Sequence, residues 1–188
     1  MKKLLLILAS CAFATSTPAA TIQFNLIGKG GAGLLTTNEP TPPIGGSGGE
    51  LGAGITFDDV SRSLSMFVGW GSSQGFTDLS SASNNSHLHG PTTNNNGNDG
   101  IGDWRQTASV LFSLTRSSNL ATGGIINQAV TLTPAQQVDL FNGKLYINLH
   151  TVNNGGGEIN GFLTPVPEPT ASLLGLGTLG LLAMRRRR

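Results

Sequence analysis

The sequence of 188 residues has few of the residue types that build redox, membrane or charge-rich sites. It contains one cysteine, one tyrosine, two tryptophans and three histidines, and only 11% of its residues are charged. The single cysteine, Cys11, excludes an intramolecular disulfide framework and a cysteine-rich metal site. The sequence has no run of 18 consecutive apolar residues, the length that marks a strong transmembrane helix. Glycine, by contrast, occurs 27 times, which favours turns and short strands.

The amino-terminal residues have the organisation of a secretory signal peptide. A short basic start is followed by an apolar run over residues 4–13 and then by small residues. The basic start stays on the cytoplasmic side while the apolar run enters the membrane. We therefore predict that residues 1–20 are a signal peptide, removed by signal peptidase after Ala14 or Ala19. The alternative is a lipid-bearing terminus at Cys11, because the residues around it resemble a bacterial lipobox.

Residues 165–188 carry three features in a fixed order. A Pro-Glu-Pro motif is followed by an uncharged segment at 171–184 and by an arginine cluster; the motif and cluster residues are Val166, Pro167, Glu168, Pro169, Arg185, Arg186, Arg187 and Arg188. As a helix, the uncharged segment would span about 21 Å, against roughly 30 Å for the hydrocarbon core of a bilayer. It is therefore a marginal membrane anchor.

Together these features resemble a PEP-CTERM sorting tail. The resemblance implies transient membrane contact and cleavage by an exosortase-type sorting protease. It also implies a location at the cell envelope, the outer surface or the extracellular matrix of a Gram-negative bacterium that makes exopolysaccharide. Such a tail is an address rather than a part of the fold.

The charge of the middle of the chain argues against nucleic-acid binding. From residue 21 to residue 165 there are five basic and nine acidic side chains, a net charge of −4, whereas the whole chain carries +1. The basic residues are concentrated at the two ends. A nucleic-acid-binding surface needs a basic patch, which the middle segment lacks. We therefore expect no nucleic acid among the partners.

Short alternating apolar runs indicate that residues 21–164 form one all-β domain. Each run is bounded by Gly, Asn, Ser or Pro, as strands usually are. This spacing, without long helical periods, is typical of an antiparallel Greek-key sandwich or barrel of about eight strands. The predicted strands are 21–28, 51–59, 63–70, 85–89, 107–115, 125–132, 144–151 and 157–164.

One short connecting helix is predicted over residues 133–143. Thr133 can cap its first turn, Pro134 suits the first helical position, and Gly143 can end it in a left-handed conformation. Two stretches dominated by turn-forming residues, 36–50 and 90–103, are predicted to be loops.

The three histidines all fall at predicted strand ends. His87 and His89 are two apart, so they share one face of their strand with Cα atoms roughly 6.6 Å apart. His150 alternates with apolar residues, which predicts that it points to the outer face of the sheet. Neutral imidazoles in this arrangement suit copper, zinc or nickel and leave a position for water. We therefore predict His87, His89 and His150 as ligands of a metal, with copper or zinc as the cofactor.

A structural role for the histidines is the alternative. In that case the imidazoles stabilise a turn through hydrogen bonds to the backbone or to the carboxylate of Glu158. Glu158 could equally orient a metal-binding histidine as an acceptor behind the ligand.

Three segments resemble the CHRD (chordin-type) domain. They are 87-HLHGP-91, 143-GKLYINLHT-151 and 155-GGGEINGFL-163, and they occur in the order typical of bacterial members. The resemblance runs from His87 to Leu163, and the domain is expected to begin near Thr21. Membership of this family does not by itself define an activity.

The histidine pattern also resembles the copper-site layout of Cu/Zn superoxide dismutase, a Greek-key β-barrel. By this resemblance His87, His89 and His150 would stand at three copper-ligand positions. The bridging histidine, the zinc ligands and the disulfide of that enzyme have no counterpart here, because the chain has no further histidine and no second cysteine.

We therefore expect an exported, non-catalytic CHRD-domain protein of the cell envelope or exopolysaccharide matrix. Its expected partners are extracellular polysaccharide or matrix proteins. One alternative is a copper-dependent, superoxide dismutase-like enzyme. Another is a carbohydrate-binding matrix module in which Trp70 or Trp104 stacks on a sugar.

Overall fold

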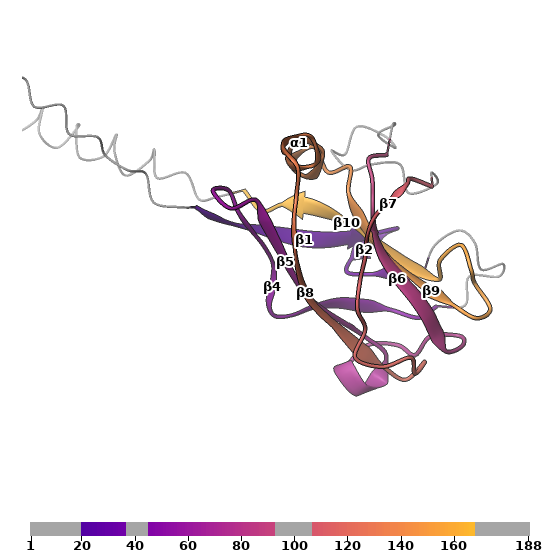
Figure 1. Cartoon of the computed structure of the whole chain (residues 1–188). Helices are drawn as coiled ribbons and strands as arrows, with labels where there is room; N and C mark the ends of the chain where they lie inside the picture. The colour runs from indigo at the N-terminus through magenta and orange to yellow at the C-terminus, as the bar shows by residue number, and fades with distance from the viewer. Residues whose placement is uncertain (1–19, 37–44, 93–106, 168–188) are drawn as a thin grey trace, which may run out of the picture.

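A computed structural model of the chain describes residues 20–36, 45–92 and 107–167 (Figure 1). The remaining ranges lie outside the described residues. They hold Cys11, Trp104 and the sorting residues from Glu168 to Arg188, whose predicted roles stay predictions.

The described residues form an all-β domain with one short α-helix, which confirms the predicted fold class. Its elements in chain order are β1 (Thr21–Gly28), β2 (Gly31–Ala32), β3 (Leu35–Thr36), β4 (Gly48–Asp58), β5 (Ser63–Trp70), the 3-10 helix η1 (Ser72–Gln74), β6 (Ser83–His89), β7 (Val110–Ser113), β8 (Gly124–Thr131), α1 (Pro134–Phe141), β9 (Tyr146–Thr151) and β10 (Ile159–Pro165).

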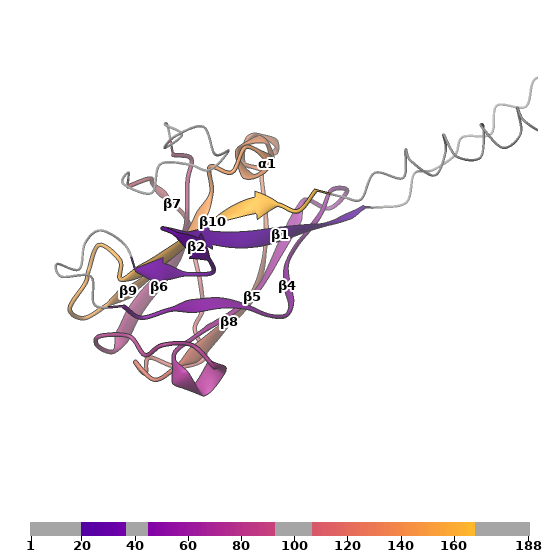
Figure 2. The ribbon, with the colours of Figure 1, turned by 180° about the vertical axis from the view of Figure 1, so that it is seen from behind.

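The strands form one antiparallel sheet that curls into a nearly closed barrel (Figures 1 and 2). Their order is β7-β6-β9-β10-β1-β4-β5-β8, with β2 attached to β1 and β3 attached to β10. Several neighbours are therefore far apart in sequence, as in β6 beside β9 and β1 beside β10. Such non-consecutive pairing is what a Greek-key arrangement requires.

The two outermost strands meet at a seam. Gln128 of β8 accepts a hydrogen bond from the Thr115 N–H (2.8 Å) and donates one to the Ser113 carbonyl (3.3 Å). Beside them, Arg116 and Ile126 form an isolated antiparallel bridge. A side chain thus joins strand edges that would otherwise leave backbone groups unpaired.

The interior of the barrel is filled by the apolar faces of the strands. Alternation along β1 buries Phe24 and Leu26, and alternation along β5 buries Leu64, Met66 and Val68. Burial of side chains of this size stabilises the fold by about 1.5–3 kcal/mol each. Trp70 is fully buried, and its indole N–H donates to the Leu120 carbonyl (3.0 Å). The alternative in which Trp70 stacks on a sugar is therefore excluded, because the ring belongs to the core.

Helix α1 covers one end of the barrel, and η1 lies at the other end (Figures 1 and 2). The predicted cap is confirmed: the Thr133 Oγ1 accepts from the Gln136 N–H (3.2 Å), and the Gln136 side chain accepts from the Thr133 N–H (2.9 Å). Gly143, with φ 64°, follows the helix in the left-handed region. In the part of the chain that the structure describes, no helix is long and apolar enough to cross a bilayer.

Some boundaries differ from prediction. The predicted loop 36–50 is wrong at Thr36, which belongs to β3, and over its last three residues, because β4 begins at Gly48 and pairs there with Trp70. β4 then loses register between Glu50 and Ile55, where glycines of positive φ interrupt the ladder. The short strands β2 and β3 were not predicted, since two residues are too few to show a period of two.

Candidate metal centre

Strands β6 and β9 place all three histidines on the outer face of the barrel wall. The two strands are antiparallel neighbours, with His87 opposite Asn148 and Asn85 opposite His150. The residues between the histidines point the other way: Leu88 and Leu149 are fully buried in the core. His150 therefore lies on the face that its alternation predicts. The face is not open to solvent, however, because only 8% of the surface of His89 and of His150 is exposed.

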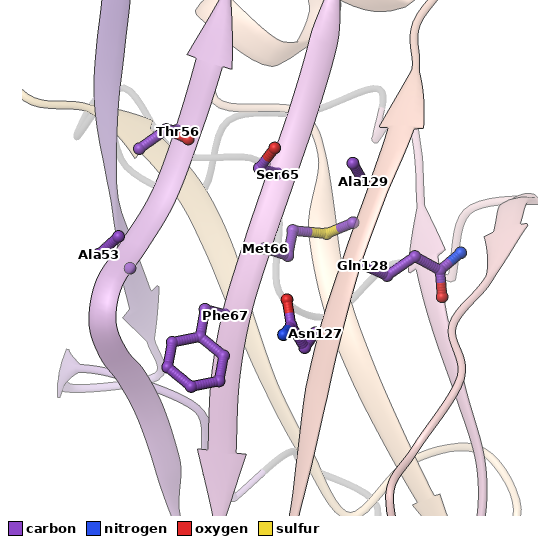
Figure 3. A pocket seen from close by; sticks show the side chains of 9 residues that line it. Ala53, Thr56, Ser65, Met66, Phe67, Asn127, Gln128 and Ala129 are labelled. Carbon is purple, nitrogen blue, oxygen red and sulfur yellow. The ribbon is translucent and has the colours of Figure 1, made fainter.

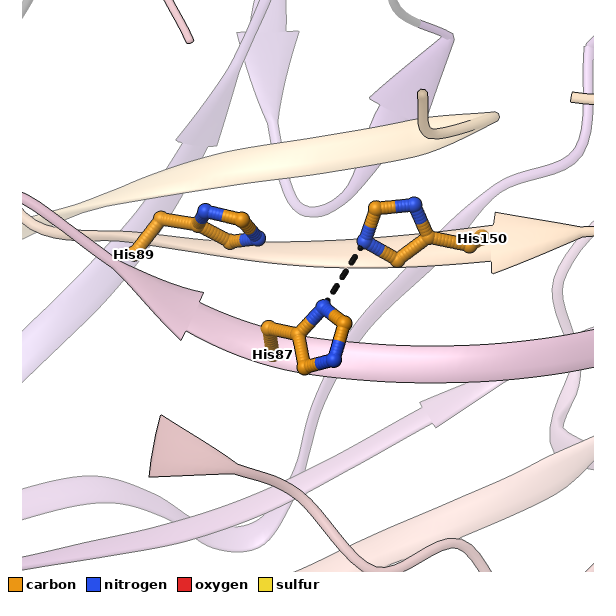
Figure 4. A group of neighbouring side chains, drawn as sticks. All are labelled: His87, His89 and His150. Atoms are coloured by element: carbon orange, nitrogen blue, oxygen red, sulfur yellow. Dashed lines mark hydrogen bonds between the residues drawn. The ribbon is translucent and has the colours of Figure 1, made fainter. Parts of the chain in front are cut away.

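The three rings converge (Figure 4). Their potential ligand nitrogens all lie within 4.8 Å of one another. The Nδ1 of His87 is 3.0 Å from the Nε2 of His150, and the ring of His89 points toward both (Figure 4). The structure thus brings together the three predicted ligands, although His87 and His150 are 63 residues apart in sequence.

The surroundings of the cluster favour neutral imidazoles. The pKa of His87 is lowered to about 4, chiefly by burial and then by the neighbouring His150, His89 and Arg116. Burial also lowers the pKa of His89, partly offset by its hydrogen bond to the Ala108 carbonyl. A buried imidazole loses hydration that its charged form needs more than its neutral form. Neutral imidazole is the state in which histidine binds a metal.

Two backbone carbonyls fix which nitrogen carries the proton. The Nδ1 of His89 is 2.8 Å from the Ala108 carbonyl, and the Nδ1 of His150 is 2.8 Å from the Gly155 carbonyl. A carbonyl only accepts, so each Nδ1 donates and each Nε2 is unprotonated; the Nε2 of His150 then accepts from the Nδ1 of His87 (3.0 Å). The Nε2 of His89 is buried and has no hydrogen-bond partner. Unpaired buried polar atoms are rare in folded proteins. A metal ion bound at this nitrogen would satisfy its lone pair.

Tyr146 supports the cluster without joining it. Its ring stacks on His89 with centroids 5.0 Å apart, and its hydroxyl accepts a hydrogen bond from the Ala108 N–H (3.1 Å). Burial raises the pKa of Tyr146, so the phenol stays protonated. Tyr146 thus packs against the His89 ring and also binds Ala108, whose carbonyl accepts the hydrogen bond from that ring. Sequence reasoning missed this role, although Tyr146 shares the alternating face of His150.

The prediction that Glu158 accepts a hydrogen bond from a histidine is wrong. Its carboxylate binds Ser80, Thr151 and Asn154, and the ring N–H groups of His89 and His150 bind carbonyls instead. The physical reason lies one residue earlier. Gly157, with φ 126°, turns the backbone just before β10, so the strand alternation does not extend back to Glu158.

A separate hollow lies on the wall formed by β4, β5 and β8 (Figure 3). Its volume is about 260 Å³, and its lining includes Ala53, Thr56, Ser65, Phe67, Asn127 and Ala129. No histidine-bearing strand contributes to it, and no titratable side chain lines it. It therefore offers no groups for acid–base chemistry and is distinct from the histidine cluster.

These features define an antiparallel β-barrel domain with a three-histidine cluster on its wall, in which His89 and His150 are buried and His87 is half-buried. The CHRD domain family matches residues 31–163, which is well over half of the chain and includes all three histidines. The chain therefore belongs to the CHRD domain family, as its motifs predicted. This family is not known as a family of enzymes. No curated protein and no solved structure matches the chain significantly.

Proposed function

We propose that this chain is an exported, non-catalytic CHRD-domain protein that binds one copper or zinc ion through His87, His89 and His150. The observation that carries the proposal is the orphaned Nε2 of His89, which is buried and turned toward two further imidazoles. A cation bound here would coordinate the lone pair of the His89 Nε2. It would also need neutral imidazoles, which is the state that burial favours.

The donor set suits these two metals. Three imidazole nitrogens without thiolate match the preferences of Cu(II) and Zn(II), whereas calcium and magnesium prefer oxygen ligands. Among the residues that the structure describes, His87, His89 and His150 are the only cluster of this kind. Three protein ligands leave a coordination position for water or a small anion.

The proposed location rests on the two ends of the sequence. A signal peptide at residues 1–20 and a PEP-CTERM tail at 165–188 support export, sorting by an exosortase-type protease and retention at the envelope or in the exopolysaccharide matrix. The acidic charge of the middle of the chain supports a partner other than nucleic acid.

The test is the metal content and metal affinity of the full chain. Elemental analysis and titration with copper and with zinc are compared with the variant His87→Ala/His89→Ala/His150→Ala. We expect one ion per chain in the original protein and none in a variant that still unfolds cooperatively. Absence of binding, or equal binding by the folded variant, would overturn the proposal.

The rival function is that of a copper enzyme of the superoxide dismutase type. The same copper-loaded protein decides between the two in a dismutase assay. Dismutation faster than that of an equal concentration of free copper would favour the enzyme, and no excess over free copper would favour the binding module.

A further inference from the structure

The most buried acidic group of the described chain lies beside the metal centre and touches none of its ligands. Glu158 has no exposed surface. Its Oε1 accepts from the Ser80 N–H (2.6 Å), and its Oε2 accepts from the Ser80 hydroxyl (2.5 Å), the Thr151 hydroxyl (2.8 Å) and the Asn154 side-chain amide (3.0 Å). Burying a carboxylate is costly unless such donors replace its water. The arrangement therefore ties three chain segments to one point.

One of these segments is the turn that joins β9 to β10. In this turn the Asn154 carbonyl accepts from the Gly157 N–H (3.1 Å), and the Asn154 N–H donates to the Thr151 carbonyl (3.2 Å). The next two carbonyls point back to the site face of β9: Gly155 accepts from the His150 ring, and Gly156 accepts from the Asn148 amide (3.0 Å). Three consecutive glycines carry no side chains to hold this turn. The Asn154 side chain anchors it instead, because its amide donates to Glu158 and to the hydroxyls of Ser80 (3.0 Å) and Thr151 (3.3 Å). Both hydroxyls donate to Glu158 in turn, so the anchor depends on this carboxylate.

We infer that Glu158 is a positioning residue of the metal centre, acting through Asn154 and the Gly155 carbonyl on the ring of His150. The inference rests on the proposed function for its effect on metal binding. With the turn in place, the Nδ1 of His150 donates to Gly155 and the Nε2 is unprotonated and faces the cluster. If the turn shifts, the proton is free to move to Nε2, and the ring no longer presents a lone pair. Groups behind a metal ligand commonly alter metal affinity by about 10- to 100-fold.

The test reads the proton on His150 directly. In the metal-free full chain at neutral pH, long-range ¹H–¹⁵N NMR of the histidine rings distinguishes Nδ1–H from Nε2–H. We expect the Nδ1–H form for His150 in the original protein and a mixture of both forms in Glu158→Gln. Copper and zinc titrations of the same samples should show affinity lower by about 10- to 100-fold in Glu158→Gln.

Two further variants complete the design. Glu50→Gln is the matched control, because the Glu50 carboxylate also accepts a backbone N–H, that of Leu26, but lies on β4; it should leave the tautomer and the affinity unchanged. If Glu158→Gln does not fold, Asn154→Ala removes the amide that binds Glu158, Ser80 and Thr151 and leaves three donors on the carboxylate, and it should give the same shift.

The outcomes separate this inference from the proposed function. Retention of the Nδ1–H form and of full metal affinity in folded Glu158→Gln or Asn154→Ala would overturn the positioning role. A changed tautomer in a chain that binds neither metal would uphold the link to His150 and overturn the metal-binding function.

Discussion

The two most buried histidines each use one ring nitrogen on the backbone and keep the other for the cluster. The acceptors are the carbonyls of Ala108 and Gly155. The hydrogen bonds to backbone that a purely structural role would predict are therefore present, but they occupy only Nδ1. The Nε2 atoms of both rings are left to face the cluster. This is expected of metal ligands that are oriented through Nδ1, and a purely structural role would not require it.

His87 makes the stability of the metal-free protein depend on pH. Its pKa is about 4 in the folded chain, against 6.5 for an ordinary histidine. Between these values the unfolded chain takes up a proton that the folded chain does not, so the free energy of unfolding falls as the pH falls from 6.5 toward 4. His89 acts in the same direction. Urea unfolding over this pH range, with a chelator present, measures the slope.

The contribution of His87 is isolated by a residue that does not titrate. In His87→Gln the loss of stability on acidification should be smaller than in the original protein. Equal slopes for the two proteins would contradict the assignment of the effect to His87.

At the scale of elements, the alternation of apolar and polar residues predicts strand bounds correctly only where strands are long and regular. Residues 21–28 and 63–70 were predicted with the bounds that β1 and β5 have. The sequence pattern predicts a loop at the first residues of β4, because Gly48 and Gly49 have no apolar side chain, although they pair with β5. A sheet accepts glycine where a neighbouring backbone comes close, and that neighbour is not visible in the local sequence.

The site was predictable to a similar extent. The spacing of His87 and His89 and the alternation around His150 sufficed to place the three rings on one outer face. The carbonyls of Ala108 and Gly155 were not predictable, since every residue has a carbonyl and only the fold selects one. Glu158 was assigned to the wrong neighbours because the positive φ of Gly157 interrupts the strand pattern.

The role of the positive φ of Gly157 can be tested by comparing two glycines in the turn between β9 and β10. At Gly157, φ is 126°, and a Cβ atom would overlap the side chain of Asn148. Gly157→Ala should therefore lower the free energy of unfolding by about 1–3 kcal/mol. At Gly155 an added Cβ would meet nothing within 4 Å, so Gly155→Ala should change it by less than about 0.5 kcal/mol. Urea unfolding of both variants gives the comparison, and equal losses would contradict the account of the turn.

At the scale of the whole molecule, closure of the barrel relies partly on a side chain, beside the bridge between Arg116 and Ile126. Gln128 binds backbone groups on both sides of Leu114, at Ser113 and Thr115, just before the bridge at Arg116. These two hydrogen bonds connect β7 to β8 at a point where no continuous ladder of backbone hydrogen bonds joins the two strands. A sheet edge left unpaired is a site for unwanted strand addition.

Removing this side chain should loosen the seam locally. In Gln128→Ala the Thr115 amide loses its acceptor, and its hydrogen exchange should accelerate about two- to tenfold, the equivalent of one hydrogen bond. Asn127→Ala, at the exposed neighbouring position, is the control and should leave exchange at Thr115 unchanged. Hydrogen–deuterium exchange resolved by NMR makes the measurement. Unchanged exchange in Gln128→Ala would contradict a role of this side chain in closing the seam.

The order of strands also decides when the barrel can be completed. β1, the first strand of the domain, lies between β4 and the last strand, β10, with Phe24 opposite Pro165. Pairings between distant parts of a chain form slowly, because the loop between them must close first. The sheet therefore cannot close until the last strand is available, and a chain that emerges gradually from its amino terminus keeps one edge of β1 unpaired until nearly the whole domain has been delivered.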